Sequence, residues 1–254
     1  MLTGIDHLVI AVADPDAAAR ELEAALGIHV DTGGRHASLG TFNRLAWFGD
    51  TYLELIGVFD PALAAGSWIG APTLKVLEGG GGLVTWSIAS DALDADRNRL
   101  RATGSDLADP ISGERVRPDG RVVRWRLAGP PSLGALAPFL IEHDPAAAEW
   151  TPADRADRSR LRHPAGGPIR LEALELRVPD VSQALQRLLR AAGLRFRPSL
   201  AGGGARDANI GSQVIRLRRG RGLEPLMATV HLAGPGLLDR SAELLGCHWV
   251  VRAG

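Results

Sequence analysis

The chain has 254 residues with 29 basic and 29 acidic side chains, and 45% of its residues are hydrophobic, which is typical of a water-soluble globular protein. No apolar run approaches the ~20 residues that cross a bilayer, so the sequence predicts no membrane partner. The single cysteine, Cys247, excludes an internal disulfide, and no basic leader precedes the first strand-like segment. Both features favour a cytoplasmic protein.

The charge is unevenly distributed along the chain. Residues 1–160 carry 15 basic and 22 acidic side chains, whereas residues 161–254 carry 14 basic and 7 acidic ones. We therefore expect the C-terminal part to dock on the acidic remainder, within the chain or between chains. Its arginines have no interleaved aromatic side chains, which argues against a nucleic-acid partner.

The first sixty residues predict one compact unit of four strands and one helix. Asp14 and Pro15 begin the helix, whose apolar residues then recur at helical spacing. Gly49-Asp50 is a turn signal between two alternating segments. The expected order is β–α–β–β–β, with strands at residues 5–13, 36–39, 41–48 and 52–58.

This layout recurs later in the chain with a constant spacing. Each time, an aspartate closes an apolar stretch and a glycine follows thirteen residues later. Asp accepts the free N–H groups of a first helical turn, and Gly tolerates the left-handed conformation at a helix end. The sequence therefore predicts three strand–Asp–helix–Gly units, with the pairs Asp14 and Gly27, Asp91 and Gly104, and Asp180 and Gly193.

These units define the expected domains. Residues 1–78 and 79–144 form two paired modules, residues 145–168 form a linker rich in Ala, Pro, Asp and Arg, and residues 169–254 form a third βαβββ-like module. The four glycines that open the second module lack the strand–helix context of a nucleotide-binding loop, so no nucleotide cofactor is predicted. The unpaired third module either caps its own chain or pairs across a homodimer.

Three polar side chains interrupt apolar strands and mark a candidate site. His7 lies in the first strand and Glu54 in the fourth, and Glu142 falls at the matching point of the second module. A buried carboxylate is costly unless it is paired, hydrogen-bonded or bound to metal. The alternatives are a core histidine bonded to a backbone carbonyl and an ion pair of Glu54 with Arg44. Strand alternation places Asp6 on the face opposite His7, and His143 on the face opposite Glu142.

Two glycine-punctuated stretches precede the third strand and add two substrate-binding candidates. They are Gly-Gly-Arg-His at residues 33–36 and Gly-Thr-Phe-Asn at residues 40–43. His36 and Asn43 are positioned to contact a substrate oxygen. The alternative is that both side chains cap loops.

These motifs, together with Leu-Glu-Leu at residues 53–55 and Pro-Phe-Leu-Ile at residues 138–141, resemble the glyoxalase-like domain of the vicinal oxygen chelate superfamily over residues 4–145. The resemblance implies an α+β fold in which paired βαβββ modules form mixed sheets that curl into a half-open barrel, with helices outside. It also implies a divalent metal (Fe, Mn, Zn, Ni or Mg) bound by His7, Glu54 and Glu142. One departure is that Val84, seven residues before Asp91, replaces the ligand that the second module usually supplies.

Two functions follow from the resemblance. The first is a metal-dependent enzyme that polarises a carbonyl or vicinal-oxygen substrate, with Glu54 and Glu142 as the catalytic carboxylates and lyase, isomerase or dioxygenase chemistry left open. The second is a metal-free protein that binds or sequesters a small molecule, as bleomycin-resistance proteins do. In either case the expected partner is a small molecule, in a cavity to which aromatic side chains contribute, namely Trp47, Trp86 and Trp125.

Overall fold

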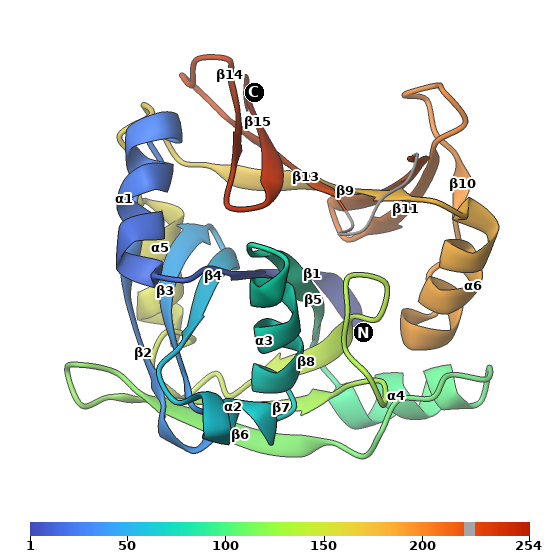
Figure 1. Ribbon diagram of the computed structural model, residues 1–254, viewed down its shortest axis with the longest axis horizontal. Coiled ribbons are helices and arrows are strands. Elements are labelled where there is room, and N and C mark those ends of the chain that lie inside the picture. The colour runs from blue at the N-terminus through green and yellow to red at the C-terminus, as the bar shows by residue number, and fades with distance from the viewer. Residues whose placement is uncertain (221–226) are drawn as a thin grey trace.

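The computed structural model describes residues 1–220 and 227–254 and contains two curved mixed sheets, one above the other (Figure 1). The first sheet has the order β2-β3-β4-β1-β5-β8-β7-β6. Its edge strands β2 and β6 contact each other, so the sheet curls into a barrel. The expected α+β fold class, a barrel of repeated modules with outer helices, is confirmed. The strands are β1 (Leu2–Ala11), β2 (Asp31–His36), β3 (Thr41–Phe48), β4 (Thr51–Val58), β5 (Gly82–Ser90), β6 (Ile111–Val116), β7 (Val122–Ala128) and β8 (Phe139–His143).

Strands β1 and β5 lie at the centre of this sheet and relate its two halves. β1 pairs in parallel with β4, and β5 pairs in parallel with β8. His7 lies opposite Tyr52 in the first pair, and Ser87 lies opposite Phe139 in the second. Val84, the position that the Asp spacing matches to His7, packs with Val9 and Ile56 in a small apolar cluster.

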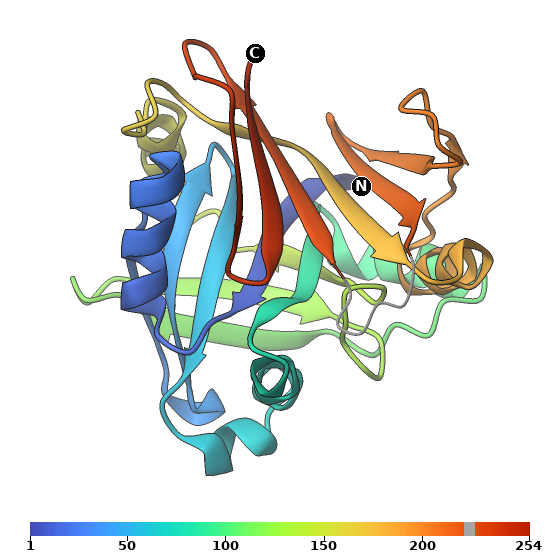
Figure 2. The same ribbon diagram turned by 45° about the horizontal axis from the view of Figure 1, so that its top comes forward.

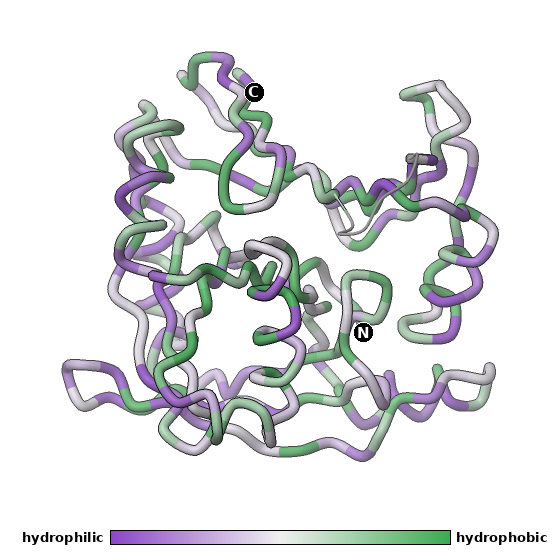
Figure 3. Tube along the Cα trace, in the orientation of Figure 1, coloured by the Kyte–Doolittle hydropathy of each residue, from purple (hydrophilic) through white to green (hydrophobic). Residues whose placement is uncertain are grey.

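Helices cover the outside of the barrel, and two of them begin and end as the Asp–Gly spacing predicts. Helix α1 (Pro15–Leu26) is capped by Asp14, and helix α6 (Val181–Ala192) is capped by Asp180. Gly27 and Gly193 end them in the left-handed conformation, with φ of 67° in both cases. In Figure 3 both helices alternate between hydrophilic and hydrophobic residues, because only one face of each packs on the core.

The expected cap at Asp91 is wrong. Helix α4 (Leu93–Arg101) begins after Ala92 and ends at Ala102, before Gly104. Ala92 stands at the cap position and offers no side-chain acceptor, and the Asp91 carboxylate pairs with the chain's amino terminus. The remaining helices are α2 (Pro61–Ala65) and α3 (Gly70–Glu78) after β4, a 3₁₀ turn at Ala37–Leu39, and α5 (Pro152–Ser159), which lies within the predicted linker.

The second sheet contains one more unit than the sequence predicts. Its order is β10-β11-β12-β9-β13-β15-β14, which repeats the order of the first sheet without its last edge strand. The last three strands form a fourth, helix-free unit that pairs with the third within the same chain. The strands are β9 (Arg170–Val178), β10 (Arg197–Pro198), β11 (Arg206–Ile210), β12 (Gln213–Arg219), β13 (Ala228–Gly234), β14 (Arg240–Leu244) and β15 (Cys247–Ala253).

The two sheets share one apolar core. Leu8 and Ile10 of β1 belong to the same buried cluster as Leu174 and Leu176 of β9. Figure 2 shows the strands of the second sheet, in yellow to red, lying across the first sheet. Among the described residues, no ion pair joins residues 1–160 to the rest, and Gln213 instead links the two sheets by hydrogen bonds to the Ile5 N–H and the Thr51 hydroxyl. The described residues contain no helix long and apolar enough to span a membrane.

Candidate functional site

A narrow cavity opens inside the first barrel. The space available to the centres of water-sized molecules is about 60 Å³, several times the ~10–15 Å³ that one water needs. Polar side chains and aromatic rings share its wall. Its polar lining consists of His7, His36, Asn43, Tyr52, Glu54, Arg115, His143 and Glu149, and its aromatic lining includes Trp68, Trp125, Phe139 and Trp150.

A β-bulge in β1 positions the first two polar groups. The pairing of β1 with β5 shifts register between Ile5 and Leu8, so that Asp6 and His7 together face one residue of β5. Such a bulge breaks the strict alternation of faces. The Asp6 carboxylate is therefore beside the His7 ring, with Oδ1 at 2.6 Å from Nδ1, rather than on the opposite face as alternation predicts.

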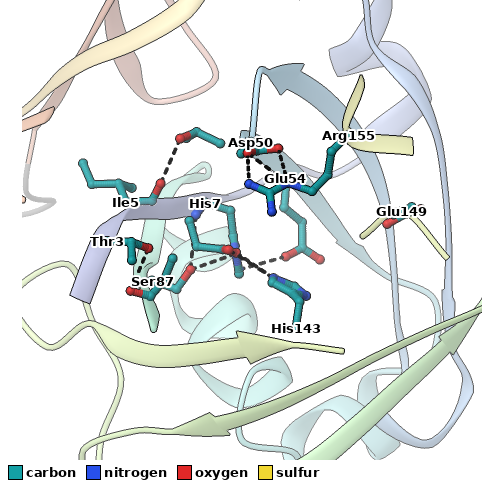
Figure 4. A network of polar contacts seen from close by, with 12 residues as sticks. Thr3, Ile5, His7, Asp50, Glu54, Ser87, His143, Glu149 and Arg155 are labelled. Carbon is teal, nitrogen blue, oxygen red and sulfur yellow. Dashed lines mark hydrogen bonds and ion pairs between the residues drawn. The ribbon is translucent and has the colours of Figure 1, made fainter. Parts of the chain in front are cut away.

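His7 is held on one side and open on the other. Ser87 Oγ lies 2.8 Å from His7 Nδ1, and the His7 ring stacks on Tyr52. Nε2 points across the cavity and lies 3.8 Å from Oε2 of Glu54. Figure 4 shows His7, Ser87, Glu54 and His143 converging on this point, from β1, β5, β4 and β8 respectively.

Glu54 is buried but has only one hydrogen-bonded oxygen in the described network. Asn43 Nδ2 donates to Oε1 at 2.7 Å, which leaves Oε2 facing His7. The alternative ion pair with Arg44 is absent, since that guanidinium binds Asp16 on the surface. Asn43 therefore orients Glu54 and does not itself point a free amide at a ligand.

The Gly33-Gly34 pair allows strand β2 to approach this network. Gly34 N–H donates to Asn43 Oδ1 at 2.8 Å. A Cβ on Gly33 would lie 2.2 Å from the backbone oxygen of Asn43, so no other residue fits there. His36, at the end of the same strand, lines the cavity with Nδ1 3.0 Å from the Thr41 hydroxyl.

Glu142 is not brought together with His7 and Glu54. In the register of β5 with β8, Ala89 lies opposite Ile141, as Val9 lies opposite Glu54 in the first module. Ile141 and His143 line the cavity from β8, and strand alternation turns Glu142, which lies between them, to the other face. Glu142 accepts the Leu93 N–H and contacts Arg126 in a wider cleft between the two sheets.

His143 occupies the cavity in place of Glu142. Its Nε2 lies 3.1 Å from each oxygen of Asp6, and its ring stacks on Trp150 at 3.7 Å between centroids. Its Nδ1 is buried with no hydrogen-bond partner among the described residues. The sequence shows that Glu142 and His143 face opposite sides, but it does not show which of them faces inward.

The electrostatics of the site follow from burial and from this network. Burial alone would raise the pKa of Asp6, but His143 and His7 beside it hold the pKa well below its usual range, so Asp6 is ionised. Burial lowers the pKa of His36, with the Glu54 charge opposing the shift. Burial and the nearby carboxylates, Asp6 first, raise the pKa of Tyr52 well above its usual value.

One of the three predicted tryptophans lines the cavity. Trp125 does so from β7. Trp47 packs behind Tyr52 and under the Arg158 guanidinium, and Trp86 is fully buried in the core between the sheets. Trp68 and Trp150 line the cavity instead, and both come from segments that the sequence marks only as connectors.

A buried ion pair completes the wall, and the sequence gives no signal for it. Arg115 of β6 bonds Glu149 through Nη2, at 2.7 and 2.8 Å to the two carboxylate oxygens. Arg115 belongs to a predicted strand with no special pattern, and Glu149 falls in the predicted linker.

The donor set does not fit a metal centre of the kind that the resemblance implies. His7 and Glu54 face each other, but of the positions that the sequence matches to them in the second module, Val84 has no ligand atom and Glu142 lies outside the cavity lining. Across the described ranges, no cluster of three or more His, Cys, Asp or Glu side chains has the geometry to hold a metal ion. Two protein donors are fewer than the three that catalytic zinc sites use.

Comparisons with known proteins agree with this architecture. A crystal structure of a hypothetical protein from Staphylococcus aureus superposes with a TM-score of 0.80 over 99% of each chain, at 16% identity. Methylmalonyl-CoA epimerase from Mycobacterium tuberculosis matches 57% of this chain and 90% of its own, at 23% identity and a TM-score of 0.42. No curated protein matches. The family model described as glyoxalase-like domain matches residues 5–192, from β1 through α6, and the chain therefore belongs to the glyoxalase-like domain family.

Proposed function

We propose that this protein is a small-molecule enzyme that transfers a proton on a carbonyl compound, with Glu54 and His7 as the acid–base pair. One observation carries the proposal. His7 Nε2 and Glu54 Oε2 face each other across the cavity at 3.8 Å, each held from behind by a hydrogen-bond partner. This separation is too long for a hydrogen bond between them. Both groups therefore border the same point of the cavity.

The tautomer of His7 supports a role in proton transfer. An ionised Asp6 can only accept hydrogen bonds, so the hydrogen at 2.6 Å between them belongs to His7 Nδ1. The neutral ring then carries a lone pair on Nε2, on the cavity side. Because Asp6 holds the hydrogen on Nδ1, the ring orientation and tautomer are fixed, and Nε2 is oriented for general acid–base chemistry.

The proposed step balances within this pair. A C–H bond next to a substrate carbonyl breaks, the proton passes to Glu54 Oε2, and the electron pair moves onto the carbonyl oxygen. His7 then accepts this proton on its Nε2 lone pair and returns it to a carbon of the substrate as the electron pair moves back from the oxygen, which gives an isomerisation. Loss of a neighbouring group instead of reprotonation gives a lyase reaction. His36, as a buried neutral imidazole, supplies a donor for the oxygen.

The test is deuterium exchange at carbon. We expect the protein to exchange α-hydrogens of at least one member of a panel of small ketones, oxo acids and thioesters in D₂O, followed by NMR. Glu54→Gln and His7→Asn should each lower the rate about 10²–10⁴-fold. Glu142→Gln is the matched control and should leave the rate unchanged. No exchange with any compound, or exchange that survives Glu54→Gln, overturns the proposal.

Metal dependence is decided in the same experiment. Protein dialysed against a chelator and checked by elemental analysis should retain its exchange activity. If activity disappears and returns with Fe²⁺, Mn²⁺, Zn²⁺, Ni²⁺ or Mg²⁺, the metal-dependent alternative replaces the metal-free mechanism.

Sequestration of a small molecule is a second candidate, favoured by the aromatic wall. Trp68, Trp125 and Trp150 surround a space that an apolar ring can fill. A ligand that quenches tryptophan fluorescence at micromolar concentration, with no exchange or turnover, would support this function instead.

A further inference from the structure

We propose that Arg115 recognises a carboxylate group on the ligand of this cavity. The inference rests on the proposed function and extends it, because it names the substrate class as a small carboxylic acid. It comes from the corner of the cavity opposite β1, where β6 meets β2 at the seam of the barrel.

Arg115 has a donor that the protein does not use. Its side chain is 95% buried, since only 5% of it is exposed, and Nη2 is taken by Glu149. Nη1 is buried with no hydrogen-bond partner among the described residues. A guanidinium stays charged at any physiological pH, and a buried donor without a partner is destabilising. An anionic oxygen in the cavity would remove that cost.

The arrangement around Arg115 is built to hold it there. Glu149 takes an unusual backbone conformation, with φ of 69°, and also accepts a hydrogen bond from Arg117 at 2.7 Å. On the other side, a Cβ on Gly34 would lie 2.9 Å from Arg115 Cδ and 3.0 Å from Nη1. The second glycine of the Gly33-Gly34 motif thus leaves room for the guanidinium at the seam.

Geometry and size together favour a small anion. Glu149 is shared by Arg115 and Arg117, and Arg117 also pairs with Asp119, so the internal partner of Arg115 is one shared carboxylate. Arginine pairs with carboxylates more favourably than with neutral acceptors. The cavity is narrow, with about 60 Å³ open to the centres of water-sized molecules, which favours a small acid.

Matched acids and amides test the proposal by isothermal titration calorimetry. The pairs are acetate and acetamide, propionate and propionamide, and pyruvate and pyruvamide. At least one acid should bind about tenfold or more tightly than its amide. Arg115→Gln should abolish this preference. Arg117→Gln is the control, because Arg117 contacts the same Glu149 from outside the cavity lining, and it should keep the preference.

Glu149→Gln provides a gain-of-function variant. Removing the internal competitor for Arg115 should tighten binding of the acid and leave the amide unchanged. If Arg115→Gln fails to fold by circular dichroism, the double variant Arg115→Gln/Glu149→Gln removes both buried charges and should also lose the preference. The proposal is overturned if no acid binds more tightly than its amide, or if either Arg115 variant retains the preference.

This binding assay separates the two proposals. It does not require turnover, so a carboxylate preference in the absence of deuterium exchange would overturn only the proposed enzyme function. Exchange on neutral ketones with no preference for acids would overturn only the role of Arg115.

Discussion

Replacing Asp6 with Asn tests the buried network at its centre. The Asp6 carboxylate accepts one hydrogen bond from His7 at 2.6 Å and contacts His143 at 3.1 Å, with only 2% of the residue exposed. Each hydrogen bond to a charged group is worth about 1.5–3 kcal/mol. Asn keeps one acceptor oxygen without the charge, so we expect Asp6→Asn to lose about 2–4 kcal/mol of unfolding free energy at pH 7.

The pH dependence of this loss has a definite sign. His143 and His7 hold the pKa of Asp6 well below its usual value, so the folded state favours the ionised form. Its contribution is fully present above the unfolded pKa of about 3.9 and is lost as the pH falls below that value toward the folded pKa. The difference in unfolding free energy between wild type and Asp6→Asn should therefore shrink as the pH falls below about 4.

Urea unfolding followed by tryptophan fluorescence at pH 7 and pH 3 measures both effects. Asp16→Asn is the control, since Asp16 pairs with Arg44 at the surface and such pairs contribute at most about 1 kcal/mol. A loss for Asp6→Asn no larger than that of the control, or a difference that grows on acidification, would refute the reasoning.

Three further predictions concern packing and reactivity. Gly33→Ala should lower the melting temperature, measured by differential scanning fluorimetry, because its Cβ would meet the Asn43 backbone oxygen at 2.2 Å. Gln213→Leu should destabilise the protein by about 1–3 kcal/mol in urea unfolding, because the Ile5 N–H loses its acceptor at the junction of the sheets. Burial raises the pKa of the Cys247 thiol to about 12, so it should resist an aromatic disulfide reagent at pH 8 until denaturant is added.

Local spacing predicts the helix ends where nothing competes with the cap. Asp14 and Asp180 serve as caps because each lies between the end of a strand and the first residue of a helix. Asp91 follows the same spacing, yet the amino terminus lies close enough to bind its carboxylate, and the helix begins one residue later, after Ala92. That contact joins the two ends of a long segment, so no local pattern could reveal it.

The sequence by itself determines the modules of the barrel and marks both members of the polar pair at its centre, His7 and Glu54. Apolar periodicity and the Asp–Gly spacing specify strand and helix types, and a His and a Glu inside apolar strands stand out because burying them is costly. The sequence does not determine the register of β8. A shift of one residue in that strand exchanges Glu142 for His143 at the cavity wall.

Only the tertiary structure decides the rest of the site. The bulge at Asp6 and His7 depends on how β1 pairs with β5, about eighty residues away in sequence. The Arg115–Glu149 pair joins edge strand β6 of the barrel to the segment that follows β8. These contacts join residues that are distant in sequence, and side-chain periodicity within one strand carries no information about partners on another.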